Sequence, residues 1–283
     1  MDRGHDVIRW LAATAVLITA ALVTFAAQAS ERPLRDMTTD RPDTTESPFT
    51  IDAGHVQVET NLAAYVRSRP DVDGAVTDTF EFATTNIRIG LTTNTEVNVV
   101  WQPYGSARTN SAGGAASQYV SGTGGLDIRG KINLWGNDTF DNTGSALALL
   151  PFLTLPTDSD NGISPGHVEG GLIVPLALAL PANFGLGLNG GVVWVKSDGA
   201  DDYHAEYLAS ASLAYEWNAK LGTYYEIAAT FNTGDQRSDS VVLLGTGVTY
   251  AMSENLQLDA GVNFGVTDAA DRINPFIGIS RRF

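Results

Sequence analysis

The sequence predicts an all-β protein: a single transmembrane, antiparallel, up-and-down β-barrel of about 12 strands. Three observations support this prediction. Apolar and polar residues alternate in stretches that repeat from residue 54 to residue 283, and most stretches reach the roughly 9–11 residues that a tilted strand needs to cross a bilayer. The connections between the stretches alternate between short and long. Charged residues are only 17% of the chain, which suits an exterior in lipid and an interior in water.

The first 29 residues are expected to be a secretory signal peptide. A mixed polar start is followed by a nearly continuous apolar run from Trp10 to Ala26, and Ala27-Gln28-Ala29 forms a small-x-small cleavage site. An apolar run that ends directly in a cleavage motif favours a signal over the alternative, a retained membrane helix. We therefore expect the mature chain to begin near Ser30 and to enter a bacterial periplasm.

The composition excludes several classes of protein. The chain contains no cysteine, so disulfides, thiol catalysis and thiolate metal sites are excluded. The formal net charge is −15, which argues against a nucleic-acid partner because phosphate binding needs clustered Lys and Arg.

The first expected strand covers residues 55–67 and alternates strictly. Val56, Val58 and Leu62 fall on one face, and Gln57 and Glu59 fall on the other. Successive side chains of a strand point to opposite faces, so this strand has one apolar and one polar face. A membrane barrel places the apolar face outside and the polar face in the lumen.

The next four strands are expected at residues 79–91, 95–102, 122–134 and 145–155. In the second strand, Phe80 and Phe82 lie on one face but Ile87 and Ile89 lie on the other, so a bulge is expected between them. Residues 103–121, rich in Gly, Ser and Ala, are expected to form a long loop. Residues 122–134 show the cleanest alternation in the chain, and the fifth strand is mostly apolar but interrupted by Pro151.

Seven further strands complete the expected barrel, at residues 168–180, 184–196, 203–217, 221–232, 240–252, 256–267 and 273–283. The connections after the second, sixth, eighth and tenth strands have about three residues, and most others are longer. Short periplasmic turns and long outer loops are typical of outer-membrane barrels. Both ends of the barrel would then lie in the periplasm. Trp101, Trp135, Trp194 and Trp217 lie near strand ends, as an aromatic girdle requires.

A closed barrel leaves no strand edge unpaired in lipid. The alternative fold is a soluble all-β sandwich or a two-domain β protein, which the uninterrupted repeat without a linker disfavours.

Motifs that extend over essentially the whole mature chain resemble a known family. The matching residues are Asp40, Arg41, Pro42, Asp43, Thr45, Glu46, Ser47, Pro48, Thr50, Gly54, His55, Gln57 and Glu59, with Gly90-Leu91, Glu96-Val97, residues 125–129, 155–157 and 253–256. On these residues the chain is similar to the outer-membrane family labelled as meta-pathway phenol-degradation proteins, which are often described as transporters. The resemblance implies uptake of aromatic or hydrophobic solutes, although a fold alone does not define a substrate.

Catalysis, cofactors and metals have little support. The mature His residues, His55, His167 and His204, are far apart and show no nucleophile–base or ligand spacing. We therefore expect no enzyme activity, no cofactor and no metal site. Acidic outer loops could bind cations together with lipopolysaccharide, or could simply be solvated. Phe283 resembles the C-terminal aromatic signal that outer-membrane barrels present to their assembly machinery, although Arg281 occupies the same face.

Charged residues fall on the polar face of many expected strands. They would line the lumen, either as a structural network of opposite charges or as a path for a solute. The residues are Glu59, Arg67, Arg88, Asp127, Arg129, Lys131, Glu169, Glu206, Glu216, Glu226 and Asp259.

Residues 30–53 are too polar and too rich in proline for a strand in lipid. Arg88, Arg129 and Lys131 are expected in the periplasmic half of the lumen, where this segment arrives. We therefore expect Asp40 to Thr50 to fold into the periplasmic mouth as a plug, with Asp43 or Glu46 paired to those cations. The alternative is a disordered tail. The plug residues are Asp40, Arg41, Asp43 and Glu46.

Two functions follow from this interpretation. The first is an outer-membrane channel or transporter for small, hydrophobic or aromatic solutes. The second is a structural or surface-anchoring barrel with a filled lumen, since 12 strands lie between small filled barrels and open porins of 16–18 strands.

Overall fold

The computed structural model describes residues 34–114, 116–158, 162–197, 202–234 and 240–283. The expected signal peptide lies outside these residues. Two short helices, η1 (Ala112–Gly114) and α2 (Phe140–Thr143), occur in connections. The strands are β1 (Val56–Arg67), β2 (Val76–Thr92), β3 (Thr95–Trp101), β4 (Tyr104–Asn110), β5 (Ser117–Gly122), β6 (Leu126–Trp135), β7 (Ser145–Leu155), β8 (Glu169–Leu180), β9 (Phe184–Lys196), β10 (Tyr203–Glu216), β11 (Leu221–Asn232), β12 (Ser240–Ser253), β13 (Leu256–Gly265) and β14 (Ile273–Arg282).

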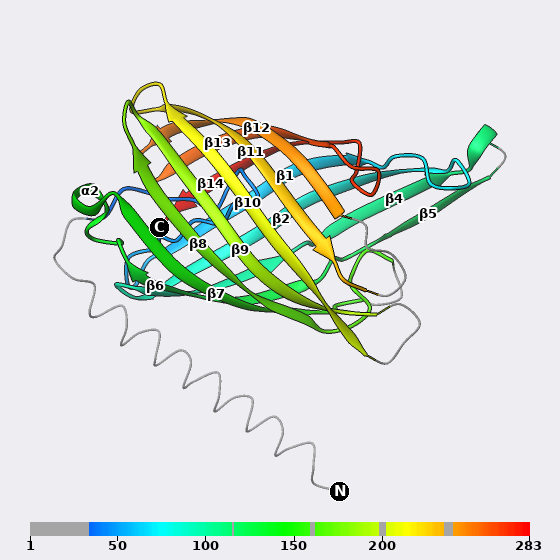
Figure 1. Cartoon of the computed structure of the whole chain (residues 1–283), viewed down its shortest axis with the longest axis horizontal. Helices are drawn as coiled ribbons and strands as arrows, with labels where there is room; N and C mark the ends of the chain where they lie inside the picture. Colours follow the sequence, from blue (N-terminus) through cyan, green and yellow to red (C-terminus); the bar gives the residue numbers. More distant parts are fainter. Residues whose placement is uncertain (1–33, 115, 159–161, 198–201, 235–239) are drawn as a thin grey trace, which may run out of the picture.

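Twelve of the strands in the described residues close into an antiparallel barrel (Figure 1). Around the barrel they follow the order β1-β2-β3-β6 and then β7 to β14, and β14 pairs with β1 to close the wall. Each barrel strand therefore has two neighbours, which satisfies the backbone hydrogen bonds without a sheet edge. The predicted up-and-down barrel is confirmed, and the soluble sandwich is wrong.

The remaining two strands, β4 and β5, correct the expectation of a loop at residues 103–121. β4 follows β3 almost directly and pairs with the first part of β2, and β5 pairs with β4 before the chain continues into β6. This hairpin projects beyond one end of the barrel (Figure 1). Alternating hydropathy arises where the two faces of a strand meet different surroundings. The hairpin projects past the barrel wall and most of β5 is exposed, so its sequence shows no such alternation.

The expected break in the second strand lies at Ala83. Its φ of 56° is in the left-handed region, which is uncommon for alanine. On its N-terminal side Phe80 and Phe82 are exposed, and on its C-terminal side Ile87 is exposed. The outward face thus changes from even to odd residue numbers across Ala83, as a bulge requires.

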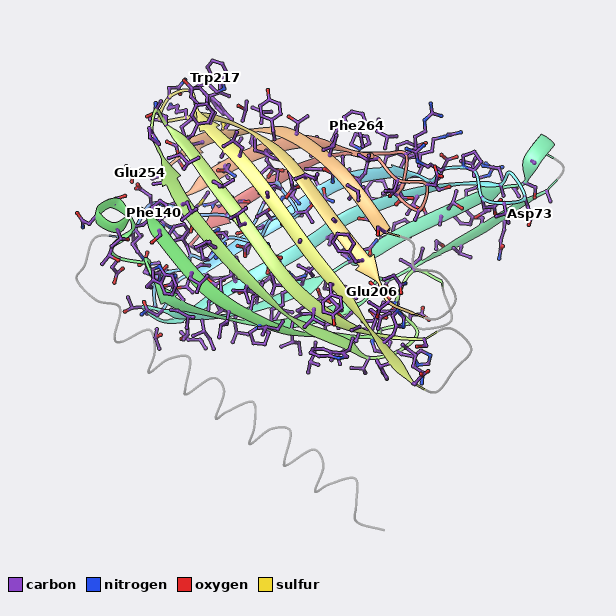
Figure 2. The ribbon with its side chains drawn as sticks, in the orientation of Figure 1. Asp73, Phe140, Glu206, Trp217, Glu254 and Phe264 are labelled. Carbon is purple, nitrogen blue, oxygen red and sulfur yellow. The ribbon has the colours of Figure 1, made fainter. Side chains whose placement is uncertain are left out.

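Large apolar side chains cover the outside of the barrel, while polar side chains are buried inside it (Figure 2). Ile128 and Phe264 are exposed, whereas Lys131 and Asp259 on the same strands are buried. The four Trp residues of the expected girdle are all exposed near strand ends. The outside is therefore the lipid face. No helix among the described residues is long and apolar enough to cross a membrane.

The connectivity predicts the orientation of the barrel in the cell. If residue 56 starts in the periplasm, the β4–β5 hairpin lies outside the cell and the β10–β11 turn lies inside. A membrane-impermeant maleimide added to intact cells should label Ala112→Cys, in the exposed tip of the hairpin, and should spare Asn218→Cys, in the exposed turn. Because the chain has no cysteine, each label reports one site. Labelling of Asn218→Cys without labelling of Ala112→Cys would show that the barrel has the opposite orientation.

Candidate functional site

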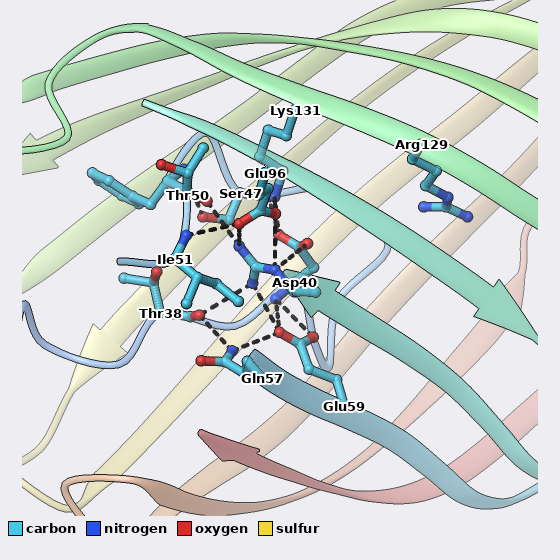
Figure 3. Close-up of polar contacts among 12 residues, drawn as sticks. Thr38, Asp40, Ser47, Thr50, Ile51, Gln57, Glu59, Glu96, Arg129 and Lys131 are labelled. Atoms are coloured by element: carbon cyan, nitrogen blue, oxygen red, sulfur yellow. Dashed lines mark hydrogen bonds and ion pairs between the residues drawn. The ribbon is translucent and has the colours of Figure 1, made fainter. Parts of the chain in front are cut away.

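The candidate site is the inside of the barrel, where four charged side chains gather on adjacent strands. Glu59 of β1, Arg88 of β2, Glu96 of β3 and Lys131 of β6 have fully buried side chains. Arg88 lies within 2.8 Å of Glu59 and 3.0 Å of Glu96, and Lys131 lies 3.5 Å from Glu96. We call these four residues the wall quartet (Figure 3).

The segment before β1 occupies the lumen and completes this cluster. We call residues 34–53 the plug. Asp40 contacts Lys131 at 2.6 Å and Arg88 at 3.3 Å, and its backbone N–H donates to Glu59 at 3.0 Å. Arg88 also donates to the plug carbonyls of Thr38 and Phe49. The plug therefore satisfies charges that the inward face of the wall presents (Figure 3).

The plug forms further ion pairs with the barrel strands, among them Asp52 with Arg282 of β14 at 3.9 Å. Glu46 pairs with Arg129 at 2.7 Å, and Arg129 also pairs with Asp127 at 2.6 Å. Arg41 pairs with Asp259 at 2.7 Å. A Cβ at Gly278 of β14 would overlap the Arg41 guanidinium, so a larger residue there would displace Arg41 from its present position.

The plug also reaches the opposite wall. The backbone N–H of Thr45 donates to Glu226 of β11 at 2.7 Å, and the Thr45 hydroxyl lies 2.8 Å from that of Ser210 on β10. With its side-chain amide oriented for hydrogen bonding, Asn189 of β9 bonds the backbone of Glu46. The plug thus spans the bore, from β1, β2, β3 and β6 on one side to β9, β10 and β11 on the other.

The structure places the expected lumen residues in several groups. Glu59, Arg88 and Lys131 meet Asp40; Asp127 and Arg129 meet Glu46; and Asp259 and Glu226 contact Arg41 and Thr45. The other expected residues are separate. Glu169 and Glu206 lie near the first residues of β8 and β10, where Glu206 is 3.6 Å from His204, and Glu216 is exposed at the last residue of β10.

Arg67 was expected in the lumen, and the structure corrects this. The pairing of β1 with β14 shifts between Asn61 and Ala63, which reverses the faces of the residues that follow. Arg67 pairs with Asp78 at 2.9 Å, and its side chain is 43% exposed. It therefore lies on the outward face of the barrel, at the last residue of β1.

The plug also differs from its expected pairing in one residue. Glu46 pairs with one of the three expected cations, but within the described part of the chain Asp43 forms no ion pair and instead faces Ser212 and Glu226. The central plug carboxylate is Asp40. Sequence reasoning also missed Glu96 of the wall quartet. Its position on the polar face of β3, beside Asn98, was the available signal.

A partly open space lies inside the barrel beside the plug. Its volume is about 230 Å³, and its polar lining residues are Thr44, Glu46, Arg129, Asn189, Ser210 and Thr230. The rest of its lining is largely apolar and includes Phe152, Ile173, Leu208, Ala228, Val241 and Leu243. We call this space the lumen cavity. Among the described residues, no group of three His, Asp or Glu side chains is placed to hold a metal ion.

Solved outer-membrane barrels share the fold. The transport unit of the autotransporter AIDA-I from Escherichia coli superposes with a TM-score of 0.54 at 11% identity, covering 93% of this chain and 98% of that one. The NanC porin has a TM-score of 0.51 at 10% identity, covering 80% of this chain and 98% of its own. The β domain of the Bordetella autotransporter BrkA has a TM-score of 0.51 at 13% identity, covering 81% and 99%. These similarities show the architecture.

At the sequence level, no curated protein matches this chain. A family described as "Putative MetA-pathway of phenol degradation" matches residues 39–283, which include the plug from Thr39 onward and the whole barrel.

Proposed function

Since this chain belongs to the family described as "Putative MetA-pathway of phenol degradation", we propose that it is an outer-membrane channel for small hydrophobic or aromatic solutes, with the plug as its gate. The observation that carries the proposal is the combination of an apolar cavity in the lumen with a polar segment across the bore. A solute would pass the cavity, and movement of the plug would open the periplasmic side.

The lining of the cavity supports the solute class. Phe152, Leu208 and Leu243 point inward from the wall, where a barrel that conducts only ions would need polar groups. Burial of apolar surface stabilises an apolar solute by about 25 cal/mol per Å². The family description, which refers to phenol degradation, agrees with a small aromatic solute.

The charges of the wall support a movable plug. With the plug seated, Arg88 and Lys131 face three carboxylates, one of which is Asp40 on the plug. When the plug leaves, Arg88 and Lys131 still face Glu59 and Glu96, so the wall quartet is neutral on its own. Removal of the plug therefore leaves no uncompensated net charge in the quartet, and water that enters the lumen can solvate it.

The alternative function is a structural barrel whose lumen the plug fills permanently. The dense hydrogen bonding of Arg88 to both plug and wall favours this alternative. The two functions differ in one measurable property, which is whether solutes or ions cross the barrel.

Deletion of residues 30–47 behind the same signal peptide tests the channel. The shortened barrel should assemble, because its wall pairing is unchanged, and its single-channel conductance in planar bilayers should exceed that of the intact protein. Swelling of liposomes in an aromatic solute should accelerate in parallel. An assembled barrel with unchanged conductance and no swelling would establish the structural alternative.

The outward position of the C-terminal residue supports a proposed assembly contact. Phe283 is 62% exposed, and the Arg281 guanidinium lies 4.8 Å from the centre of its ring. We propose that the barrel assembly machinery binds Phe283, and that outer-membrane lipid and lipopolysaccharide surround the finished barrel.

Seating of the plug should depend on pH through Asp43, which lies outside the spanning strands. Removal from water raises the pKa of its carboxyl from 3.8 to about 7; a hydrogen bond with Ser212 opposes this rise, and the charge of Glu226 adds to it. The other titratable groups facing Asp43 are Glu46 and the Tyr224 hydroxyl. The seated plug therefore binds a proton more tightly than the released plug.

The sign of this linkage predicts a more open channel at higher pH. The contribution of Asp43 to seating is complete below about pH 4 and is lost as the pH rises to about 7. Conductance should therefore be larger at about pH 8 than at about pH 5. Asp43→Asn should remove much of this difference. A conductance that rises on acidification would contradict the assignment.

A further inference from the structure

The outward face of the projecting β4–β5 hairpin is exposed and continues the lipid face of the barrel (Figure 1). Residues opposite each other in a sheet point to the same side, so the exposed Tyr104, Arg108 and Tyr119 share the outward face of β1 and β2. The inward face of the hairpin is partly covered, because a Cβ at Gly105 would lie 2.8 Å from the side chain of Ile163. Only the outward face is therefore open along its length to a ligand from the membrane.

Aromatic side chains form the part of this face that is nearest the barrel. Tyr65 of β1 and Phe80 of β2 lie opposite each other, with ring centres 5.0 Å apart. Phe82 of β2 lies opposite Tyr104 of β4, with ring centres 6.2 Å apart. Phe80, Phe82 and Tyr104 are all exposed. Aromatic rings at the end of a lipid face mark the level of the lipid headgroups.

The next outward-facing residues along these strands are charged. Asp78 of β2 lies between Arg67 of β1 and Arg108 of β4, and Tyr119 of β5 lies opposite Arg108. We call these four residues the charged row. Arg67 pairs with Asp78 at 2.9 Å, whereas Arg108 forms no ion pair or hydrogen bond within the described parts of the chain. One carboxylate against two guanidinium groups leaves the charged row with a net positive charge just beyond the aromatic rings.

We propose that the charged row binds a phosphate group of lipid A, the membrane anchor of lipopolysaccharide, with Arg108 as its main contact and an acyl chain along Phe80 and Phe82. A guanidinium binds a phosphate through two parallel hydrogen bonds. The hydroxyls of Tyr104 and Tyr119, which lie 3.2 Å apart, offer further contacts to the sugar. The orientation predicted from the connectivity places this face at the outer leaflet, where lipid A resides. The inference does not depend on the channel.

The combination of rings and charge distinguishes lipid A from simpler ligands. A lipid without a phosphate would contact the aromatic rings but would leave Arg108 without a partner. Inorganic phosphate would reach Arg108 but would gain nothing from the rings. The site should therefore prefer phosphorylated to dephosphorylated lipid A, and millimolar inorganic phosphate should not displace the lipid.

Native mass spectrometry of the full-length mature barrel in detergent, mixed with phosphorylated or dephosphorylated lipid A, tests the site. Removal of the phosphates should weaken binding by about tenfold, the range of one hydrogen bond to a charged group. Arg108→Gln should weaken binding of the phosphorylated lipid by about the same factor. Since Arg108 has no partner within the described parts of the chain, this variant should assemble like the intact barrel.

A matched control lies elsewhere on the barrel. Lys196 is the last residue of β9, and its Nζ lies 5.4 Å from the ring centre of Tyr203, so it also places a cation beside an aromatic ring at the end of a strand. Lys196→Gln should leave lipid A binding unchanged. Equal losses in Lys196→Gln and Arg108→Gln would show that any cation near a strand end attracts the lipid, and would overturn the site.

Three other results would also overturn the inference. They are full binding of lipid A by Arg108→Gln, equal binding of the phosphorylated and dephosphorylated lipids, and maleimide labelling that places the hairpin in the periplasm. Flux through the barrel after deletion of residues 30–47 has no bearing on this site, so failure of the channel and failure of the lipid site are measured separately.

Discussion

Oxidation of the double variant Thr45→Cys/Ser210→Cys should stop aromatic solute flux, and reduction should restore the flux of the unmodified barrel. The two hydroxyl oxygens lie 2.8 Å apart, one on the plug and one on β10. Two cysteines at this separation can form a bond of about 2.0 Å with a small adjustment. The bridge would fix the plug across the bore, so a channel that opens by plug movement would have no open state.

The native chain contains no cysteine, so the introduced pair forms the only possible intramolecular disulfide. A matched control is Thr77→Cys/Thr109→Cys, whose hydroxyl oxygens are also 2.8 Å apart but join β2 to β4 instead of joining the plug to the wall. Liposome swelling should be insensitive to oxidation in the control. If the oxidised Thr45–Ser210 bridge leaves swelling at full rate, solutes do not pass through the plugged bore.

The parts of the fold that touch lipid could be predicted from the sequence. Lipid on one side and lumen on the other force an alternation that is visible in the residues, as between Ile128 outside and Lys131 inside. Elements whose two faces do not differ in this way could not be predicted from the sequence. The β4–β5 hairpin was expected as a loop, and Arg67 was placed inside because the bulge after Asn61 shifts the faces without a mark in the sequence.

The position of the plug could be predicted from the sequence, but its particular contacts could not. Charge composition predicted that residues 40–50 meet the cations of β2 and β6, because unpaired charges in a narrow lumen are costly. The particular partners depend on the path of the chain through the bore. Asp40, not Asp43, meets Lys131. The plug also approaches β2 closely at Gly90, where a Cβ would overlap the carbonyl oxygen of Asp52. Such a contact between segments far apart in the chain leaves no periodic signal.

The barrel should be most sensitive to the loss of Arg88. This guanidinium is fully buried and contacts Glu59, Glu96 and Asp40, and it also donates to two plug carbonyls. Arg88→Met keeps much of the length and volume but leaves three buried carboxylates facing Lys131 alone. Breaking a buried ion pair by removing one partner costs about 3–5 kcal/mol. Urea titration of the barrel folded into lipid vesicles should show this loss.

Two comparisons test whether this loss of stability depends on the seated plug. Arg129→Met removes a guanidinium that is 20% exposed and contacts fewer groups, so its effect should be smaller. In a barrel lacking residues 30–47, Asp40 is absent and water can reach the wall quartet, so Arg88→Met should cost much less there than in the intact chain. An equal cost in both backgrounds would mean that Arg88 stabilises the wall alone, and that the charges of the plug contribute little to holding it in the lumen.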